Sequence, residues 1–457
     1  MKKFLTLSVI SLLIAGAVIT SCSDDKTDGP APIVTEGDGN VQLKLSNALP
    51  GLRAYNGEEP AIAGETELAS TVSVYVYDES GVLDYQNPAL PVNSSGLTNT
   101  FKVSEGMKYF YIFSNGQTST VSSGSSWDEL ENQVARVTFQ NNRPTPIADE
   151  GSMSIGTLWR IGDDTHALCN KFDVQPAGSV AQPVRAPISI GRATAKVRLT
   201  EINKESSPGA SPLKGVFSPN PIYRLRSLPE RYYVVGHLDE SGDYPPTDGL
   251  RYISFAHDLP PGTLEVPSTS FLDYFWEGAL TPSTTTHYYA VENTTRKMEI
   301  PDPLKDGAYL YYGNTTYVQF KITYTPDASE LYSPALPPVL STNSISTGDT
   351  FWSAVYRGSR MIFDSEPEGP EFTEIYEYEN GEMYYKFPIR DQRETGVDRQ
   401  CCVIRNHYYE IKVSNIFNLG EPTDKVDPKT PIDETDPDVE VLITVLPWFK
   451  VEQEENL

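Results

Sequence analysis

Histidines, cysteines and paired acids are the residue types that could support catalysis or metal binding in this chain, and they are scattered. The sequence contains no His-x-Glu, His-Glu-x-x-His or Cys-x-x-Cys spacing of a metal site. The histidines are His166, His237, His257, His287 and His407. No Gly-x-Ser-x-Gly motif and no phosphate-binding glycine loop occurs. Asp163-Asp164-Thr165-His166 could be a ligand cluster, but a solvated loop is the favoured interpretation. The sequence therefore predicts no catalytic residue, no metal, no cofactor and no enzyme activity.

The net charge limits the classes of partner that this protein could bind. The 457 residues include 62 acidic and 36 basic side chains, a formal net charge of -26. A field of this sign repels phosphate backbones and anionic lipid headgroups, so nucleic acid is excluded as a partner. Carboxylates are so numerous that acidity alone gives no support for glycosidase-type acid–base catalysis.

The N-terminus carries the first chemically specific feature. Lys2 and Lys3 precede an apolar run over 4–19 that is short for a membrane span and typical of a signal peptide. Ile19-Thr20-Ser21-Cys22 resembles a bacterial lipobox. This predicts a lipoprotein signal peptide over 1–21 and lipidation, such as palmitate, at Cys22; an ordinary cleaved signal is the alternative.

The remaining cysteines are Cys169, Cys401 and Cys402, and three thiols cannot all pair within one chain. Cys401 and Cys402 are adjacent, so in a strand they point to opposite faces. Buried thiols that act as small apolar side chains are favoured over a structural disulfide.

A short strand followed by an exposed basic bond is the second chemical feature. Residues 23–40 form a polar tether, after which Val41, Leu43 and Leu45 alternate with polar residues as in a half-buried strand. Turn-forming residues over 48–57 flank the Arg53–Ala54 bond and predict an exposed loop. Arg185-Ala186 and Arg192-Ala193 show that the dipeptide itself is common; the position directly after a detachable strand favours Arg53 as the cleavage site.

The elements that position these features are strands. Alternating apolar and polar residues predict strands over 72–76, 108–113, 195–199 and 317–324. Asn380-Gly381 is the favoured pair for a tight hairpin turn between two aromatic-rich strands. One helix is expected after the capping-box sequence Ser126-Trp127-Asp128-Glu129, with Trp127, Leu130 and Val134 on one face. The fold class is therefore all-β.

Prolines near 183–190 mark the best domain break. We expect a propeptide with the removable strand over 22–53, an N-terminal β-sandwich over 54–188 and a C-terminal β-sandwich over 189–417. Residues 418–438 are acidic and proline-rich, which predicts an extended, self-repelling linker.

The last segment, 439–457, carries an apolar stripe at alternating positions. Its members are Val439, Val441, Ile443, Val445, Phe449 and Val451. The stripe spans about 43 Å if fully extended, and it either folds back into its own sheet or is offered to another chain by strand addition. In a second version, 439–448 is the last strand of the chain's own domain and only 449–457 is donated. The acids of that short tail make it a poor apolar plug.

Together these features resemble the fimbrillins, or type V pilins, the lipoprotein-derived subunits of Bacteroides-type fimbriae, and within them the major subunit type of short fimbriae. The resemblance covers nearly the whole chain: the lipobox, the strand before Arg53, the run 106–112, and the run 405–413 followed by Trp448. It implies two tandem Greek-key, transthyretin-like β-sandwich domains followed by a linker and a donor strand.

The resemblance also implies a mechanism. An outer-membrane lipoprotein precursor is cut between Arg53 and Ala54 by an arginine-specific protease, which removes the anchor and the strand of Val41, Leu43 and Leu45. The C-terminal strand of a neighbouring copy fills the groove, giving a head-to-tail homopolymer, because heterologous contacts that do not close build filaments. Accessory anchor and tip fimbrillins and surface receptors for adhesion and biofilm formation are the further expected partners. The membrane is contacted only through the precursor lipid.

Two other classes remain open. A carbohydrate-binding surface lipoprotein would share the lipobox, the strands and the many tyrosines, but it needs neither a cleavable Arg53 nor a C-terminal apolar stripe. An accessory anchor would keep its lipid and first strand, and a tip subunit need not donate a strand.

Overall fold

The computed structural model confirms the all-β prediction, because β-branched and aromatic residues form strands almost throughout. Its single α-helix within the described parts is α1 (Trp127–Glu131), and short 3-10 turns are η3 (Ala328–Glu330) and η4 (Glu379–Gly381). The structure describes residues 33–34, 37, 39–46, 70–114, 126–132, 134–136, 138–140, 143–145, 155–157, 170–175, 182–192, 194–203, 213–233, 235, 237–238, 252–253, 259, 264, 270–294, 297–300, 307–391, 401–405, 407–432 and 438–447. No helix among these residues is long and apolar enough to cross a membrane.

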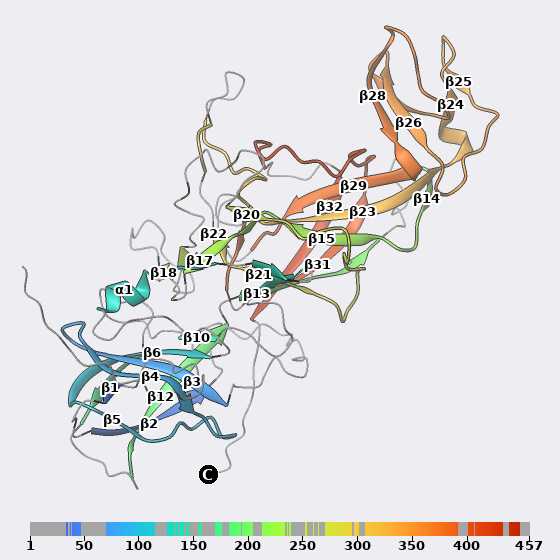
Figure 1. Cartoon of the computed structure of the whole chain (residues 1–457). Helices are drawn as coiled ribbons and strands as arrows, with labels where there is room; N and C mark the ends of the chain where they lie inside the picture. Colours follow the sequence, from blue (N-terminus) through green and yellow to red (C-terminus); the bar gives the residue numbers. More distant parts are fainter. Residues whose placement is uncertain are drawn as a thin grey trace, which may run out of the picture. The chain divides into compact units, whose positions relative to one another are not determined.

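The N-terminal half is built on one nine-stranded sheet (Figure 1). In sheet order its strands are β1 (Ile33–Val34), β4 (Leu83–Pro91), β3 (Thr71–Asp78), β6 (Gly106–Ser114), β10 (Ile155–Thr157), β12 (Val184–Arg192), β2 (Gly39–Ser46) and β5 (Phe101–Val103), with β11 (Asn170–Val174) also on β6. β2 and β12 run parallel, whereas the other pairs are antiparallel.

β3 is buried on both faces, although its alternation predicts a half-buried strand. Val72, Val74 and Val76 face the apolar core of the N-terminal sheet. Tyr75 and Tyr77 face the opposite way, into a second cluster to which α1 and residues 402 and 404 contribute. The second face is covered because later parts of the chain return to it.

The C-terminal half has two four-stranded sheets that share one core. The first is β21 (Tyr288–Val291), β13 (Thr194–Ile202), β31 (His407–Ile416) and β32 (Val439–Pro447); the second is β14 (Gly215–Phe217), β23 (Tyr317–Pro326) and β15 (Ile222–Arg226), with β29 (Glu382–Pro388) on β23. The predicted stripe of β23 is confirmed, because Val318, Phe320, Ile322 and Tyr324 are all buried in that core. β12 belongs to the N-terminal sheet and β13 to the first C-terminal sheet. The domain boundary expected at residue 188 stays a prediction.

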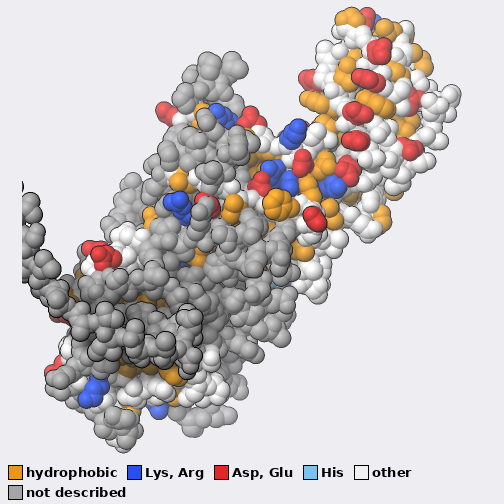
Figure 2. All heavy atoms as spheres, viewed as in Figure 1, with side chains coloured by type: hydrophobic (Ala, Val, Ile, Leu, Met, Phe, Trp, Pro, Cys, Tyr) orange, Lys and Arg blue, Asp and Glu red, His pale blue; other side chains and the backbone are white. Residues whose placement is uncertain are grey.

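A five-stranded sheet arises from the chain between β23 and β29. Its order is β25 (Val339–Leu340), β24 (Leu331–Ser333), β27 (Ser359–Phe363), β26 (Phe351–Tyr356) and β28 (Phe372–Tyr378). On the face in Figure 2, acidic side chains stand out over the lobe that holds this sheet, in keeping with the exposed positions of Glu374 and Glu377 on its edge strand β28. Charges on an edge strand discourage the addition of another strand.

The Asn380-Gly381 turn has the expected backbone but not the expected role. Asn380 and Gly381 have φ values of 55° and 67°, as a tight turn of this type requires. However, β28 pairs with β26 and β29 pairs with β23, so the turn links strands of two sheets and the hairpin prediction is wrong. A Cβ at Gly381 would lie 2.7 Å from the Tyr324 carbonyl oxygen, which shows how closely the turn packs on β23.

The predicted helix is confirmed in position but is shorter than expected. The Glu129 carboxylate accepts a hydrogen bond from the Ser126 backbone N–H at 3.1 Å, as a capping box requires. The helix ends at Glu131, and Val134 begins β7 (Val134–Arg136) instead of continuing the helical face.

Five two-stranded pairs complete the described elements. They are β7 with β17 (Arg231–Tyr233), β8 (Thr138–Gln140) with β9 (Arg143–Thr145), β16 (Leu228–Pro229) with β20 (Phe271–Leu272), β18 (His237–Leu238) with β19 (Tyr252–Ile253), and β22 (Asn293–Thr294) with β30 (Cys402–Val403).

Candidate functional site: the first and last strands

β2 is an interior strand held on both sides. Val41, Leu43 and Leu45 are buried in the N-terminal core, with exposed fractions of 0, 0 and 3%. On one side β2 pairs with β12, and on the other with β5 and the loop that precedes it. The burial of all three side chains is what a strand that fills a groove in the N-terminal sheet requires.

The loop before β5 is hydrogen-bonded to the backbone of β2. The Leu43 N–H donates to the Thr98 hydroxyl at 3.0 Å, and the Leu43 carbonyl accepts from the Thr98 N–H at 3.1 Å. The Leu45 N–H donates to the Gly96 carbonyl at 2.8 Å. Removing β2 would leave these groups, together with one edge of β12, without their present partners.

The predicted lipidation and cleavage positions, Cys22, Arg53 and Ala54, lie outside the described residues. The competing Arg-Ala dipeptides start at Arg185 and Arg192, and both arginines lie in β12. Arg185 is in register with Gln42 of β2, and Arg192 with Ile155 of β10. A protease that binds an extended substrate would have to open the pairing of β12 with β2 to reach the Arg185–Ala186 bond.

β32 lies at the edge of the first C-terminal sheet and pairs with β31 over nine register positions, from Val439 opposite Ile416 to Pro447 opposite His407. Val439 and Ile443 are buried in the C-terminal core, and Val441 packs against it. The alternate side chains point outward, and Leu442 is 53% exposed. In this structure the stripe is folded back into its own sheet, one of the two arrangements left open by the sequence. The backbone of Val445 pairs with Tyr409, whereas Phe449 and Val451 lie outside the described residues.

The segment that joins β31 to β32 departs from the predicted self-repelling linker. Residues 418–432, which we call the strap, are fixed to the second C-terminal sheet. The Asp424 carboxylate accepts from Arg224 Nη2 at 3.1 Å and from Trp276 Nε1 at 3.0 Å. The Asp424 carbonyl accepts from Arg226 Nη1 at 2.9 Å and from Gln319 Nε2 at 3.0 Å. The acids of this segment were expected to repel one another, but Asp424 has two arginines beneath it.

Those arginines form a largely buried cluster. Arg224 and Arg226 lie two residues apart on β15 and therefore share a face. Arg226 pairs with Asp273 at 2.7 Å, and Arg224 stacks on the Trp276 ring at 4.2 Å. Burial and the neighbouring Arg226 charge lower the pKa of Arg224. Sequence analysis missed this cluster; its signal was Arg-x-Arg in a strand that faces an acidic segment.

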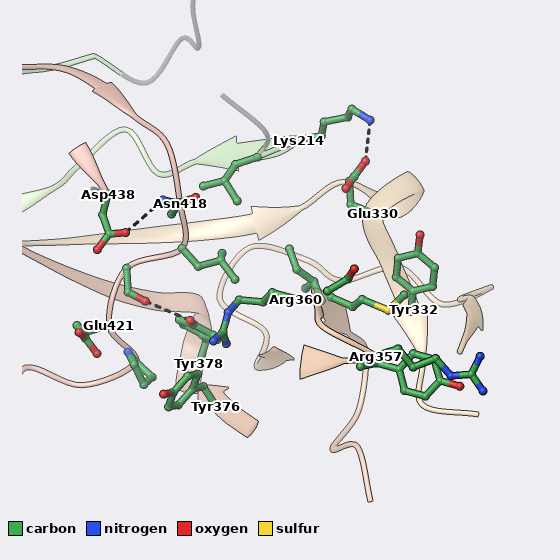
Figure 3. Close-up of a pocket in the computed structure, with 18 residues that line it drawn as sticks. Lys214, Glu330, Tyr332, Arg357, Arg360, Tyr376, Tyr378, Asn418, Glu421 and Asp438 are labelled. Atoms are coloured by element: carbon green, nitrogen blue, oxygen red, sulfur yellow. Dashed lines mark hydrogen bonds and ion pairs between the residues drawn. The ribbon is translucent and has the colours of Figure 1, made fainter. Parts of the chain in front are cut away.

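The N-terminal end of β32 borders a cavity of about 940 Å³ (Figure 3). Asp438, Asn418 and Glu421 line it together with Tyr376 and Arg360 of the five-stranded sheet. The Asn418 amide donates to Asp438 at 3.4 Å, and the Phe417 N–H donates to the Asp438 carbonyl at 2.8 Å. Burial raises the pKa of Asp438, and the nearby Glu421 charge adds to this rise against the opposing effects of Asn418 and Lys386.

Among the described residues, the other chemically reactive residue types form no site. Cys401 and Cys402 are buried and contribute to different apolar clusters, as their opposite directions predict. Within the described ranges, no three His, Cys, Asp or Glu side chains gather to hold a metal ion. Cys169 and the Asp163–His166 cluster fall outside those ranges.

Comparison with known proteins now bears on the C-terminal strands. Residues 376–454 match the family model of the fimbrillin C-terminal region, described as major fimbrial subunit protein type IV. Over these residues the chain matches the fimbrillin family. The fimbrillin region runs from β28 through β29, β31 and the strap to β32, so it contains both the strap and the edge strand. The match supports a fimbrial subunit of the cell surface and confirms the resemblance found in the sequence.

The solved structures that match this chain include three that are named for fimbriae or adhesion. A fimbrilin (fimA) from Porphyromonas gingivalis W83 is 14% identical, with a TM-score of 0.48 over 92% of this chain and 99% of that one. A candidate cell adhesion protein from Parabacteroides distasonis is 16% identical, with a TM-score of 0.46 over 90% and 99%. The C-terminally truncated tip fimbrial protein Mfa3 from P. gingivalis is 12% identical, with a TM-score of 0.38 over 91% and 99%. Comparison with curated proteins yields no match.

Proposed function

We propose that this chain is a structural stalk subunit of a surface fimbria and assembles by protease-triggered donor-strand exchange. Its precursor is a lipoprotein of the outer membrane, lipidated at Cys22. Cleavage between Arg53 and Ala54 leaves a mature subunit of 457 - 53 = 404 residues. The fimbrillin C-terminal match supports this proposal. The same match supports a structural role without enzyme activity.

The observation that carries the proposal is the contrast between β2 and β32. β2 contributes three buried aliphatic side chains to the N-terminal core and has neighbours on both sides. Its loss would expose apolar surface and unpaired backbone groups, which is costly until another strand occupies the groove. β32 has the alternating stripe of such a strand and lies at a sheet edge.

The timing of assembly follows from covalent connection. While β2 belongs to the same chain as its groove, its effective concentration exceeds that of any donor from another copy. Cleavage after Arg53 removes this advantage. The neighbouring copy then supplies its C-terminal strand head-to-tail, which yields a filament that supports adhesion and biofilm formation, together with anchor and tip subunits.

The test is digestion of the non-lipidated precursor with an arginine-specific protease. We expect a new N-terminus at Ala54 and a ladder of oligomers on an unboiled gel, and deletion of 439–457 should abolish the ladder. An Arg53→Ala precursor should stay monomeric, which controls for cleavage at Arg185 or Arg192. A cleaved protein that never assembles would contradict the stalk role and favour an accessory subunit or a binding lipoprotein.

A further inference from the structure

The cavity beside Asp438 has the size and the walls of a preformed ligand site. Its volume of about 940 Å³ lies near the upper end of the range of about 300–1,000 Å³ that is typical of small-molecule sites. One wall consists of Asn418 and Glu421 from the strap, together with Asp438 (Figure 3). The other wall comes from the five-stranded sheet and includes Arg360 of β27 and Tyr376 of β28.

Hydrogen bonds hold the strap wall of this cavity in place. The Tyr378 hydroxyl of β28 donates to the Gly420 carbonyl of the strap at 3.1 Å, so the two walls are joined directly. Glu421 forms two backbone hydrogen bonds with Tyr384 of β29, at 2.8 and 2.9 Å. Because the backbone of this wall is already ordered, a ligand that binds here pays less of the entropic cost of association.

The charges that line the cavity balance one another. Three lining side chains are basic and three are acidic: Lys214, Arg357, Arg360, Glu330, Glu421 and Asp438. Lys214 pairs with Glu330 at 2.6 Å, and Arg360 pairs with Glu374. Although the whole chain has a formal net charge of -26, this lining has no surplus charge that would select an anion or a cation. A neutral ligand with many hydroxyl groups is favoured, because carboxylates accept from hydroxyls and guanidinium groups donate to them.

Polar groups on both walls keep hydrogen-bonding capacity that no described residue uses. The Asp438 side chain is half-buried, yet within the described part of the chain it accepts one hydrogen bond, from Asn418 at a long 3.4 Å. An ionised carboxylate has about four acceptor sites, so most of its capacity is unused. On the opposite wall, the Arg360 guanidinium donates to Ser353 and Glu374, and its Nε–H has no acceptor among the described residues.

Tyrosine rings supply the apolar part of the lining. Four tyrosines contribute to it: Tyr332, Tyr356, Tyr376 and Tyr378. Tyr376 is 39% exposed, and the Arg360 guanidinium lies over its ring, 5.1 Å from the centroid. A tyrosine ring offers an apolar face beside a polar hydroxyl. A sugar ring has the matching combination, an apolar C–H face surrounded by hydroxyl groups.

We propose that this cavity binds a short, neutral oligosaccharide. The Tyr376 ring contacts the C–H face of one sugar, the carboxylate of Asp438 accepts from sugar hydroxyls, and Arg360 donates to them. A phosphate or sulfate group would instead meet the carboxylates of Glu421 and Asp438, which disfavour an anion. The site goes beyond the proposed stalk role, because it gives the body of the subunit a ligand and does not depend on assembly.

The test uses the uncleaved, non-lipidated precursor, so that binding is measured without assembly. The protein is applied to an array of neutral, sialylated and sulfated oligosaccharides, and each neutral compound that binds is titrated by isothermal calorimetry. We expect binding to neutral compounds, and we expect Tyr376→Ala and Asp438→Asn each to weaken it by about tenfold. Tyr376→Phe keeps the ring and should bind like wild type.

Two matched controls lie outside the lining. Tyr309→Ala removes a tyrosine of similar exposure, 36%, and Glu440→Gln removes an exposed carboxylate of β32; both should bind like wild type. Thermal unfolding checks that every variant is folded, and Arg360→Gln, at a side chain that is 36% exposed, replaces any that is not.

The proposal is overturned if no neutral oligosaccharide on the array binds, or if sialylated and sulfated compounds alone bind. It is also overturned if the folded Tyr376→Ala and Asp438→Asn variants bind neutral compounds as tightly as wild type. A protein that binds no sugar but forms the oligomer ladder after cleavage contradicts the oligosaccharide site and leaves the stalk role intact. A protein that binds sugar but forms no ladder contradicts the stalk role alone.

Discussion

The Arg224 guanidinium donates to the Asp424 carboxylate over 3.1 Å, although 200 residues separate them in the chain. Arg224 lies in β15, and Asp424 lies in the strap that joins β31 to β32. The contact therefore fastens the fimbrillin C-terminal region to a strand outside the matched residues 376–454.

Neutralising Asp424 tests the strength of this contact. Asp424→Asn leaves Arg224 and Arg226 with Asp273 as their remaining carboxylate in the cluster. Because Arg224 is buried but Asp424 is partly exposed, we expect unfolding free energy to fall by about 1–3 kcal/mol. Denaturant unfolding measures this change.

Asp427→Asn is the matched control, since Asp427 is an exposed acid of the same strap whose side-chain oxygen accepts from the Lys429 N–H. An asparagine keeps that acceptor, so this variant should unfold like wild type. Equal losses for both variants would mean that the Arg224 contact adds nothing specific.

Truncating the middle of β2 tests how firmly the removable strand fills its groove. Leu43 is 0% exposed and lies in the N-terminal core. Leu43→Ala should lower the unfolding free energy of the precursor by about 2–5 kcal/mol, the usual range for a large-to-small core substitution. Thermal unfolding of the uncleaved precursor measures it. Lys44→Ala, at the neighbouring half-buried position, should cost much less; a similar cost would contradict the observed orientation of β2.

The turn between β28 and β29 offers a test of backbone geometry. Gly381 has a φ of 67°, and a Cβ there would meet the Tyr324 carbonyl oxygen at 2.7 Å. Gly381→Ala should therefore destabilise the protein by more than about 1 kcal/mol. Asn380→Gly, at a φ of 55°, should be close to neutral because glycine adopts this conformation freely. Chemical denaturation of both variants measures these changes. If Gly381→Ala were also neutral, the turn would tolerate a Cβ at this position and the close approach to Tyr324 would be contradicted.

Local sequence pattern was enough to predict several of the strands and the one described helix. The alternation in 41–45, 195–199 and 317–324 identified β2, β13 and β23, because successive side chains of a strand point to opposite faces and apolar residues line one of them. The capping box located α1 for the same local reason. The all-β class and the edge-strand stripe of β32 follow from signals of this kind.

Long-range pairing could not be predicted in this way. Asn380-Gly381 specifies a tight turn, but which strands pair beyond it depends on partners far along the chain. Likewise, the acids of 418–438 predict mutual repulsion unless Arg224 and Arg226 are known to lie beneath Asp424. Burial of both faces of β3 depends on α1 and residue 402, which sequence periodicity does not reveal.

Asp438, at the N-terminal end of β32, gives a prediction of how stability depends on pH. Burial raises the pKa of Asp438, directly before β32, above the ordinary value of 3.8, with Glu421 adding to the rise and Asn418 and Lys386 opposing it. A carboxyl with a raised pKa in the folded state binds a proton more readily when folded. Its ionisation therefore costs folded-state stability, and this cost disappears as pH falls through the raised pKa.

Asp438→Asn removes that ionisation and should stabilise the docked β32 at neutral pH. The advantage of the variant over wild type should be constant near neutral pH and should shrink as the pH is lowered into the range from the raised pKa of Asp438 down towards 3.8. Hydrogen exchange of the β32 amides measures docking directly. Glu440→Gln controls for loss of a carboxylate on the exposed face of the same strand. An Asp438→Asn effect that stays constant across this range would show that the carboxyl acts through packing and not through its charge.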